Sequence, residues 1–139
     1  MSKTGPIILI DDDQDDLDIA EMVISQLGIN NRLIKFTSAQ KAFEYLLAEE
    51  DQPFIILSDI NLPRMSGIEL KRAIENNDEL RRKSIPFVYY STAGQPSLVS
   101  KAFELQVQGF FVKESSIEKM AACFKLIFDY WLTSRHPNN

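Results

Sequence analysis

Four short apolar runs in this chain each end directly on a polar side chain. The runs and the residues that follow them are 7–10 with Asp11-Asp12-Asp13, 54–58 with Asp59, 87–90 with Ser91, and 109–112 with Lys113. Short apolar runs separated by helical patterns are typical of buried parallel strands in an α/β sheet. The ligand site of such a sheet lies at the carboxyl ends of its strands. We therefore expect acids, a hydroxyl and a lysine to meet at one edge.

The alternation of patterns predicts a doubly wound, five-stranded parallel sheet with helices on both faces, because crossovers between parallel strands are right-handed. The expected strands are 6–10, 32–36, 54–58, 86–91 and 109–112, and the expected helices are 14–27, 38–50, 66–77, 96–107 and 115–132. A chain of 139 residues suits one domain. Its core is expected over about residues 6–132, followed by a polar tail at 133–139.

Composition excludes several classes of function. The net charge of −5 argues against a nucleic-acid surface, which would be basic. The two basic clusters, Lys71-Arg72 and Arg81-Arg82-Lys83, are expected on solvated faces. No apolar run approaches the length of a membrane span, and the N-terminus has no cationic, apolar signal. We thus expect neither a nucleic-acid partner nor a membrane.

The single cysteine and the single histidine narrow the chemistry further. Cys123 has no second cysteine to pair with, which suits a reducing cytoplasm. His136 lies in the polar tail. A histidine-ligated zinc site and a catalytic triad are therefore disfavoured.

The helices show start signals and apolar faces. Asp13 can cap helix 14–27, and Asp15 and Asp16 are favourable in its first turn. Helix 96–107 is expected to bury Leu98, Val99, Ala102, Phe103 and Leu105, and helix 115–132 to bury Ile117, Ala121, Phe124, Phe128 and Trp131. A second apolar row on helix 115–132 holds Cys123, Ile127 and Tyr130. This row indicates a wide core face or, alternatively, a contact with a partner or a second copy.

The polar strand ends together favour metal-assisted phosphoryl chemistry. Several carboxylates at one edge repel one another and favour a bound cation, and hard oxygen ligands suit Mg²⁺. Asp59 could attack phosphorus as a carboxylate nucleophile. Lys113 and the Ser91 hydroxyl could stabilise the charge of the transferred group. Each residue alone is explained as a cap or a surface charge, whereas the four strand ends together are not.

In these residues the chain resembles the receiver domain of two-component response regulators, most of all the small stand-alone receivers. The matching residues are Asp11 and Asp12 after the first strand, the segment from Asp59 through Pro63 to Gly67, Ser91 and Lys113. The resemblance implies a flavodoxin-like three-layer αβα fold with strand order 2-1-3-4-5. It also implies a signalling switch rather than an enzyme.

The resemblance further implies roles for individual residues. Asp59 would be the phosphoacceptor, and Mg²⁺ would be held by Asp12, Asp59 and the Asn61 main-chain carbonyl, with Asp11 acting through water. The phosphoryl donor would be a histidine kinase or a histidine phosphotransfer protein. Ser91 and Phe110 would form the switch. A downstream protein would read the surface of helix 96–107, strand 109–112 and helix 115–132.

Three departures from the family pattern concern the output geometry. One is that Tyr89 and Tyr90, in strand 86–91, are bulkier than the aliphatic residues expected there. Glu114 follows Lys113 where the family usually has proline in a cis peptide, and a non-proline cis bond costs roughly 2.5–4 kcal/mol. The sequence leaves open whether the Lys113–Glu114 peptide is cis or trans. Phe110 lacks the hydroxyl of the more usual tyrosine.

Two other functions compete with this interpretation. Asp11-Asp12-Asp13 with Ser91 and Lys113 also resembles a haloacid-dehalogenase-type phosphatase, in which Asp11 would be the nucleophile. Asp15 stands where that motif usually has threonine or valine, and Asp59 would have no role. The other alternative is a degenerate receiver that binds a partner without phosphorylation, suggested by Glu114 and Phe110. The phosphorylated receiver ranks first.

Overall fold

Every run that the sequence predicts as a strand forms one in the computed structural model, which describes residues 2–48 and 52–137. The strands are β1 (Ile7–Ile10), β2 (Leu33–Phe36), β3 (Ile55–Ser58), β4 (Phe87–Ser91) and β5 (Gly109–Val112). The helices are η1 (Ser2–Thr4), α1 (Gln14–Gln26), α2 (Ala39–Ala48), α3 (Gly67–Glu75), α4 (Asp78–Lys83), α5 (Pro96–Glu104) and α6 (Ile117–Thr133). Within the described residues the expected bounds agree to within a few residues, and positions 49–50 of the helix expected at 38–50 lie outside that part of the chain.

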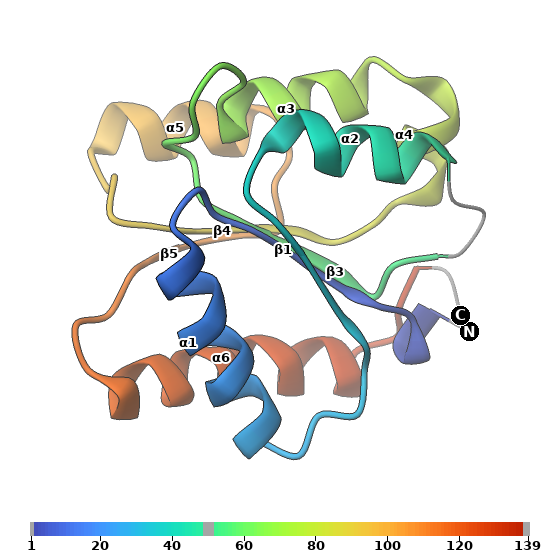
Figure 1. The fold of residues 1–139 in the computed structure, drawn as a ribbon. Helices are drawn as coiled ribbons and strands as arrows, with labels where there is room; N and C mark the ends of the chain where they lie inside the picture. The colour runs from blue at the N-terminus through green and yellow to red at the C-terminus, as the bar shows by residue number, and fades with distance from the viewer. Residues whose placement is uncertain (1, 49–51, 138–139) are drawn as a thin grey trace.

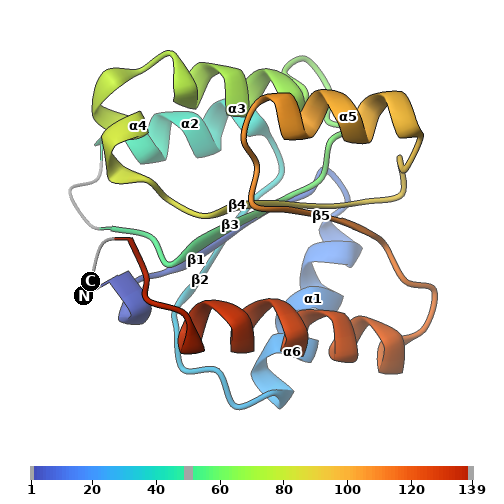
Figure 2. The same cartoon turned by 180° about the vertical axis from the view of Figure 1, so that it is seen from behind.

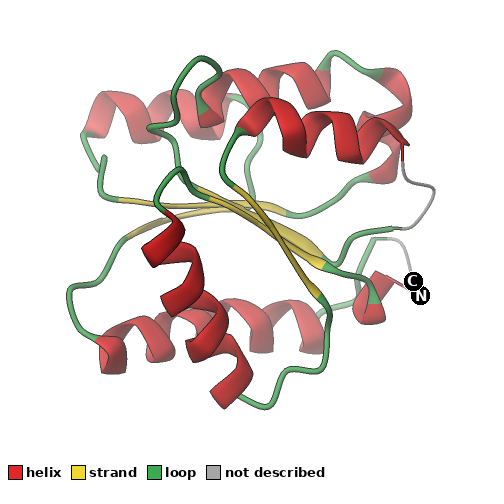
Figure 3. Cartoon of the chain, viewed as in Figure 1, coloured by secondary structure: helices red, strands yellow, loops and turns green. Residues whose placement is uncertain are grey.

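The strands form one parallel sheet in the order β2-β1-β3-β4-β5, as expected. Helices α1 and α6 cover one face, and α2, α3, α4 and α5 cover the other (Figures 1 and 3). Successive strand residues point to opposite faces. Ile8 and Ile10 therefore pack beneath α2 and α3, whereas Ile7 and Leu9 pack against α1 and α6. The molecule consequently has two apolar layers, one on each side of the sheet.

The helix expected at 66–77 is split in two. Helix α3 ends at Glu75, and Asn77 begins α4 by accepting a hydrogen bond from the Leu80 backbone N–H at 3.0 Å. An asparagine side chain competes for backbone hydrogen bonds and so favours a cap over a helix interior. The Asn76-Asn77 pair therefore separates two helices that the apolar pattern alone does not resolve.

Several helical core expectations need correction. Ala102 is buried, but Phe103 is 51% exposed and Ile117 is 50% exposed. In the second row of α6, Ile127 is buried and Tyr130 is 62% exposed. The row is thus neither wholly core nor wholly surface. A helical period predicts an apolar face, but it does not determine which residues at the edge of that face are covered by the sheet.

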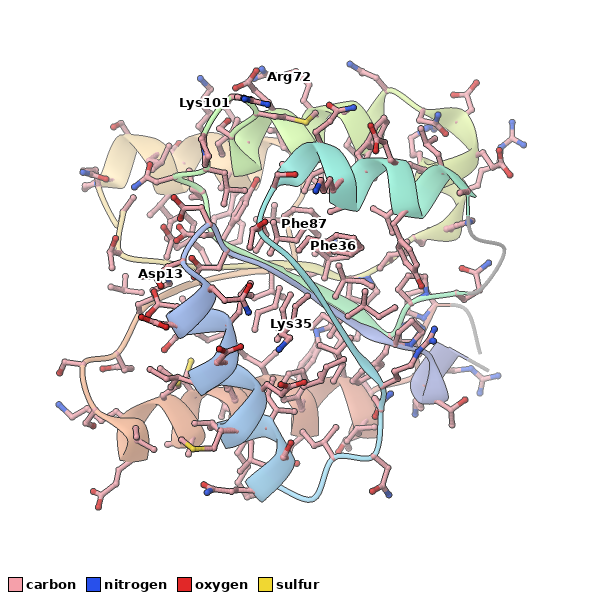
Figure 4. All side chains as sticks on the ribbon, viewed as in Figure 1. Asp13, Lys35, Phe36, Arg72, Phe87 and Lys101 are labelled. Carbon is pink, nitrogen blue, oxygen red and sulfur yellow. The ribbon has the colours of Figure 1, made fainter. Side chains whose placement is uncertain are left out.

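Two polar residues expected at the surface are buried. Lys71 is 4% exposed, forms an ion pair with Glu75 at 2.7 Å and lies 5.6 Å from the Phe87 ring centroid. Its neighbour Arg72 is exposed, as expected (Figure 4). His136 is 1% exposed, and its Nε2 lies 2.8 Å from the Phe54 carbonyl oxygen. The described part of the tail therefore brings His136 back onto the domain.

Candidate functional site

The carboxyl ends of four strands place the predicted polar residues together. The backbone N–H of Asp59 donates to the Ile10 carbonyl at 2.9 Å, which places the end of β3 beside the end of β1. The backbone N–H of Lys113 donates to the Ser91 carbonyl at 2.9 Å, which places the end of β5 beside the end of β4. The four polar strand ends therefore lie along one edge of the sheet. The register of the sheet is what converts residues far apart in sequence into one site.

Asp59 is buried and its two carboxylate oxygens have different surroundings. Oδ1 accepts hydrogen bonds from the backbone N–H groups of Ile60 at 2.7 Å and Asn61 at 3.3 Å, and from Ser91 Oγ at 2.6 Å. Oδ2 accepts one from Lys113 Nζ at 3.0 Å. Oδ1 is thus held by three donors, which leaves Oδ2 as the less encumbered oxygen.

Lys113 connects the acids of this site. Its Nζ lies 2.6 Å from Asp11 Oδ2, 3.0 Å from Asp59 Oδ2 and 3.2 Å from Asp16 Oδ2. Burial lowers the pKa of Lys113, but its hydrogen bonds to Asp11 and Asp59 outweigh that effect, so the pKa lies above the usual lysine value. The lysine therefore stays charged and compensates the carboxylates around it.

Asp11 is 8% exposed, and burial raises the pKa of its carboxyl above the usual value. The hydrogen bonds from Lys113 and from the Asp13 backbone N–H only partly oppose this rise. Asp13 itself caps α1, as predicted, by accepting from the backbone N–H groups of Asp15 and Asp16. The first turn of α1 is consequently anchored directly beside the acid pair (Figure 4 labels Asp13).

Three of the acids are arranged to share a cation. Asp11, Asp12 and Asp59 each offer a carboxylate oxygen, and these oxygens all lie within 4.8 Å of one another. Asp12 is exposed, so the group opens to solvent. Hard carboxylate oxygens in an open site fit a divalent cation that keeps some water ligands. The donor set is therefore suited to such an ion.

The loop after β5 has a trans peptide bond between Lys113 and Glu114. The described residues contain no cis peptide bond, so the Lys113–Glu114 peptide is trans. The Glu114 backbone N–H donates to the Tyr90 hydroxyl oxygen at 3.1 Å. A proline at position 114 would have no N–H to donate. The hydrogen bond to the Tyr90 hydroxyl thus supports the loop in the conformation that it has here, with a trans peptide.

Phe110 lies beside the site, on β5. It is half-buried, and its ring centroid lies 5.8 Å from that of Tyr89. Tyr89 is fully buried, and its hydroxyl donates to the Gly67 carbonyl at 2.6 Å. Tyr89 therefore joins Phe110 to the start of α3, in the segment that follows Asp59.

The structure brings together Asp11, Asp59, Ser91 and Lys113, and it places Asp12 and Asn61 beside them. Sequence reasoning missed the contacts of Asp16 and Tyr90 with this site. It used Asp16 only as a favourable charge in a helical first turn, and it assigned no role to Tyr90. The position of Asp16 one helical turn after Asp12 is the one signal that could have pointed to it.

Comparisons with known proteins agree with this geometry. Residues 7–125 match the family described as the response regulator receiver domain. Response regulator Rcp1 of Synechocystis is 27% identical over 131 residues, covering 91% of this chain and 88% of that protein. A protein of Rhizobium etli described as probable chemotaxis protein CheY is 26% identical, covering 88% and 91%.

Solved structures show the same fold. The Mn²⁺-bound form of response regulator Rcp1 has a TM-score of 0.81 at 26% identity and covers 94% of this chain and 96% of that chain. The phosphorylated cyanobacterial phytochrome response regulator RcpA has a TM-score of 0.84 at 24% identity, with the same two coverages. The three-layer fold expected from the sequence is thus confirmed.

Proposed function

Because this chain belongs to the response regulator receiver domain family, we propose that Asp59 is its phosphoacceptor. The family and its relatives establish a phosphoacceptor function in two-component signalling, and they do not favour the phosphatase or the phosphorylation-independent alternatives. The observation that supports Asp59 most directly is its buried carboxylate, held by Ser91 and Lys113 at the end of the central strand. Asp11, the nucleophile of the phosphatase alternative, has no comparable contact with Ser91 among the hydrogen bonds of the site.

The chemical step follows from the two unequal oxygens of Asp59. Oδ2 attacks phosphorus, and the bond from phosphorus to the donor's imidazole nitrogen breaks with its electron pair moving to that nitrogen. Lys113 and Ser91 then face the negative oxygens of the transferred group. Because phosphoryl transfer depends mainly on positioning and charge, these residues suffice on the protein side. Loss of the phosphoryl group to water is the only other reaction we assign, so the chain acts as a switch.

The acids fit a divalent metal, and Rcp1 has been crystallised with Mn²⁺. For this chain we propose Mg²⁺, with Asp12, Asp59 and the Asn61 main-chain carbonyl as ligands and Asp11 acting through water. When bound, the ion would neutralise carboxylate charge and polarise a phosphoryl oxygen. The protein's part is to hold these oxygens within reach of one ion.

The proposed donor is a histidine kinase or a histidine phosphotransfer protein, as for receiver domains in general. We propose a cytoplasmic location, which suits the unpaired Cys123. Within the described part of the chain, no helix is long and apolar enough to cross a membrane. The net charge of −5 supports the absence of nucleic acid among its partners.

We propose an output surface made of α5, β5 and α6, with Ser91 and Phe110 as its switch. All three elements carry large exposed apolar residues: Phe103 on α5, Val112 on β5, and Ile117, Leu126, Tyr130 and Leu132 on α6. Figure 2 shows β5 at the edge of the sheet with α5 and α6 on its two sides. Such residues at a protein surface suit a protein contact, either with a downstream target or with a second copy of the chain.

The experiment that tests the function is intact mass after incubation with a small phosphodonor and Mg²⁺. We expect one added phosphoryl group on the wild type, none on Asp59→Asn, and an unchanged fold by circular dichroism because the change is nearly isosteric. Undiminished labelling of Asp59→Asn would rule out the assignment. Loss in Asp11→Asn alone, with turnover of phosphate esters, would instead support the phosphatase.

A further inference from the structure

The ammonium group of Lys113 contacts three acceptors. A lysine ammonium carries three N–H donors. Asp11, Asp59 and Asp16 each accept from Nζ, at 2.6, 3.0 and 3.2 Å respectively. In this state all three donors of the lysine are therefore engaged by carboxylates.

Asp16 differs from the other two acids that contact Lys113. Its side chain is 46% exposed, against 11% for Asp11 and 8% for Asp59. It is not among the three acids whose oxygens converge on the candidate cation position, which are Asp11, Asp12 and Asp59. Its placement depends on the start of α1, where its backbone N–H donates to the capping Asp13. Asp16 thus lines the same cavity as Asp11 and Asp59, and its side chain contacts the site at Lys113.

Phosphorylation changes what Lys113 must bind. A phosphoryl group on Asp59 brings new acceptor oxygens and additional negative charge next to Nζ. The N–H that contacts Asp59 Oδ2 turns to the phosphoryl oxygens when Oδ2 bonds to phosphorus. A second N–H can reach the phosphoryl group only if the bond to Asp11 or to Asp16 opens. The bond to Asp16 is the longest, and water can solvate the released Asp16 carboxylate because it is half-exposed. The bond to Asp16 is consequently the one to open.

We propose that Asp16 is a positioning residue that competes with the phosphoryl group for Lys113. In the unphosphorylated protein it holds the third donor of the lysine on the α1 side of the site. Its negative charge also opposes the arrival of an anionic phosphoryl group. Asp16 therefore limits how readily Asp59 is phosphorylated, an inference that rests on Asp59 being the phosphoacceptor.

The test compares the rate of phosphorylation by acetyl phosphate at saturating Mg²⁺, followed by intact mass. We expect Asp16→Asn to react about two- to fivefold faster than the wild type, the size of effect expected for one partly exposed ion pair. Asp15→Asn is the matched control, because Asp15 is the exposed neighbour in the same first turn and removal of its charge alters the overall field equally. Asp16→Glu keeps the charge and should restore a rate near that of the wild type.

A double-mutant cycle separates competition for the lysine from a structural effect. In a Lys113→Met background, Asp16→Asn should change the rate by much less than it does in the wild type. A slower Asp16→Asn variant, or an equal acceleration by Asp15→Asn, would overturn the proposal. Absence of any adduct on the wild type would instead mean that the proposed phosphoacceptor function has failed.

Discussion

At the scale of single residues, Lys113 decides the electrostatics of the site. Three carboxylates lie within 3.2 Å of its Nζ, and two of these acids are almost fully buried. Buried carboxylates are costly unless they are paired and hydrogen-bonded. The positive charge of the lysine therefore offsets the mutual repulsion of the carboxylates at this edge of the sheet.

Cys123, on α6, has a shifted pKa that gives a prediction about pH. Burial, with a smaller contribution from Glu114, raises the pKa of the Cys123 thiol from 9.0 to about 11. The folded protein thus keeps a proton between these values that the unfolded chain has lost. The contribution of Cys123 to stability accordingly falls as the pH rises from 9.0 towards 11.

Because the thiolate is the reactive form, alkylation of folded Cys123 by iodoacetamide should be slow at pH 8. We expect a rate ~100-fold below that of the chain in urea, since each pKa unit is a tenfold change in thiolate. Mass spectrometry across a pH series measures both rates, and Cys123→Ser shows that the adduct is on this residue. An inflection near pH 9 in the folded protein would contradict the prediction.

At the scale of elements, the start of α3 is packed against the strand end that carries Asp59. A Cβ atom on Gly67 would lie 2.3 Å from the Asp59 carbonyl oxygen and 3.0 Å from Tyr89 Cε1. Ser66 and Glu69 form a capping box that holds the helix start at this point. A shift of the start of α3 would therefore displace the backbone at Asp59.

Gly67→Ala should lower the free energy of unfolding by about 1–3 kcal/mol, because the new methyl group overpacks a backbone contact. It should also slow phosphorylation, since the segment that holds Asp59 must shift. Urea denaturation and the intact-mass assay measure the two effects.

Gly94→Ala is the control for this substitution. Its Cβ would meet only Val112 Cγ2, at 2.9 Å, and that side chain is 53% exposed and free to turn away. We expect a smaller loss of stability there. Equal losses in both variants would show that the close approach at Gly67 has no special effect.

At the scale of the whole molecule, we expect the fold to be stable without a metal, because Lys113 compensates the acids at the sheet edge. The amino-terminal and carboxyl-terminal segments are also joined, since Lys3 Nζ donates to the Leu132 carbonyl at 3.0 Å and His136 packs against Phe54. Figures 1 and 2 both show η1 beside the end of α6. We therefore expect cooperative unfolding of the entire domain in metal-free buffer.

Thermal melts with and without Mg²⁺ should both be cooperative for the wild type, with a modest rise in Tm when the ion is present. Lys113→Ala should be destabilised by about 3 kcal/mol, the lower end of the cost of breaking a buried ion pair. Mg²⁺ should then raise the Tm of Lys113→Ala more than that of the wild type, because the ion replaces the lost positive charge. Outright unfolding of the metal-free wild type, or equal rises in Tm, would contradict this account.

The strands and the chemistry of the main site follow from local pattern, whereas the strand order was expected from the resemblance to receiver domains. Apolar runs at 7–10 and 54–58 form buried strands, because every side chain in them is suited to the interior of the sheet whichever helices cover it. The polar residues that end the runs gather because parallel strands present their carboxyl ends at one edge. A helical period gives the buried face and its edges less sharply. Phe103 and Ile117 were expected in the core and are exposed, and Phe103 directly follows the buried Ala102, from which its side chain points away around the helix.

The amino-acid sequence by itself therefore determined the α/β architecture and the set of acids, hydroxyl and lysine at the sheet edge. Only the tertiary structure decided the contact of Lys113 with Asp16, the support of Glu114 by Tyr90, and the burial of Lys71 and His136. Residues 113 and 16 lie 97 positions apart, and their contact depends on how α1 and the loop after β5 pack on the same face. Local sequence sets which side chains reach the end of a strand, whereas the packing of distant elements sets what those side chains meet.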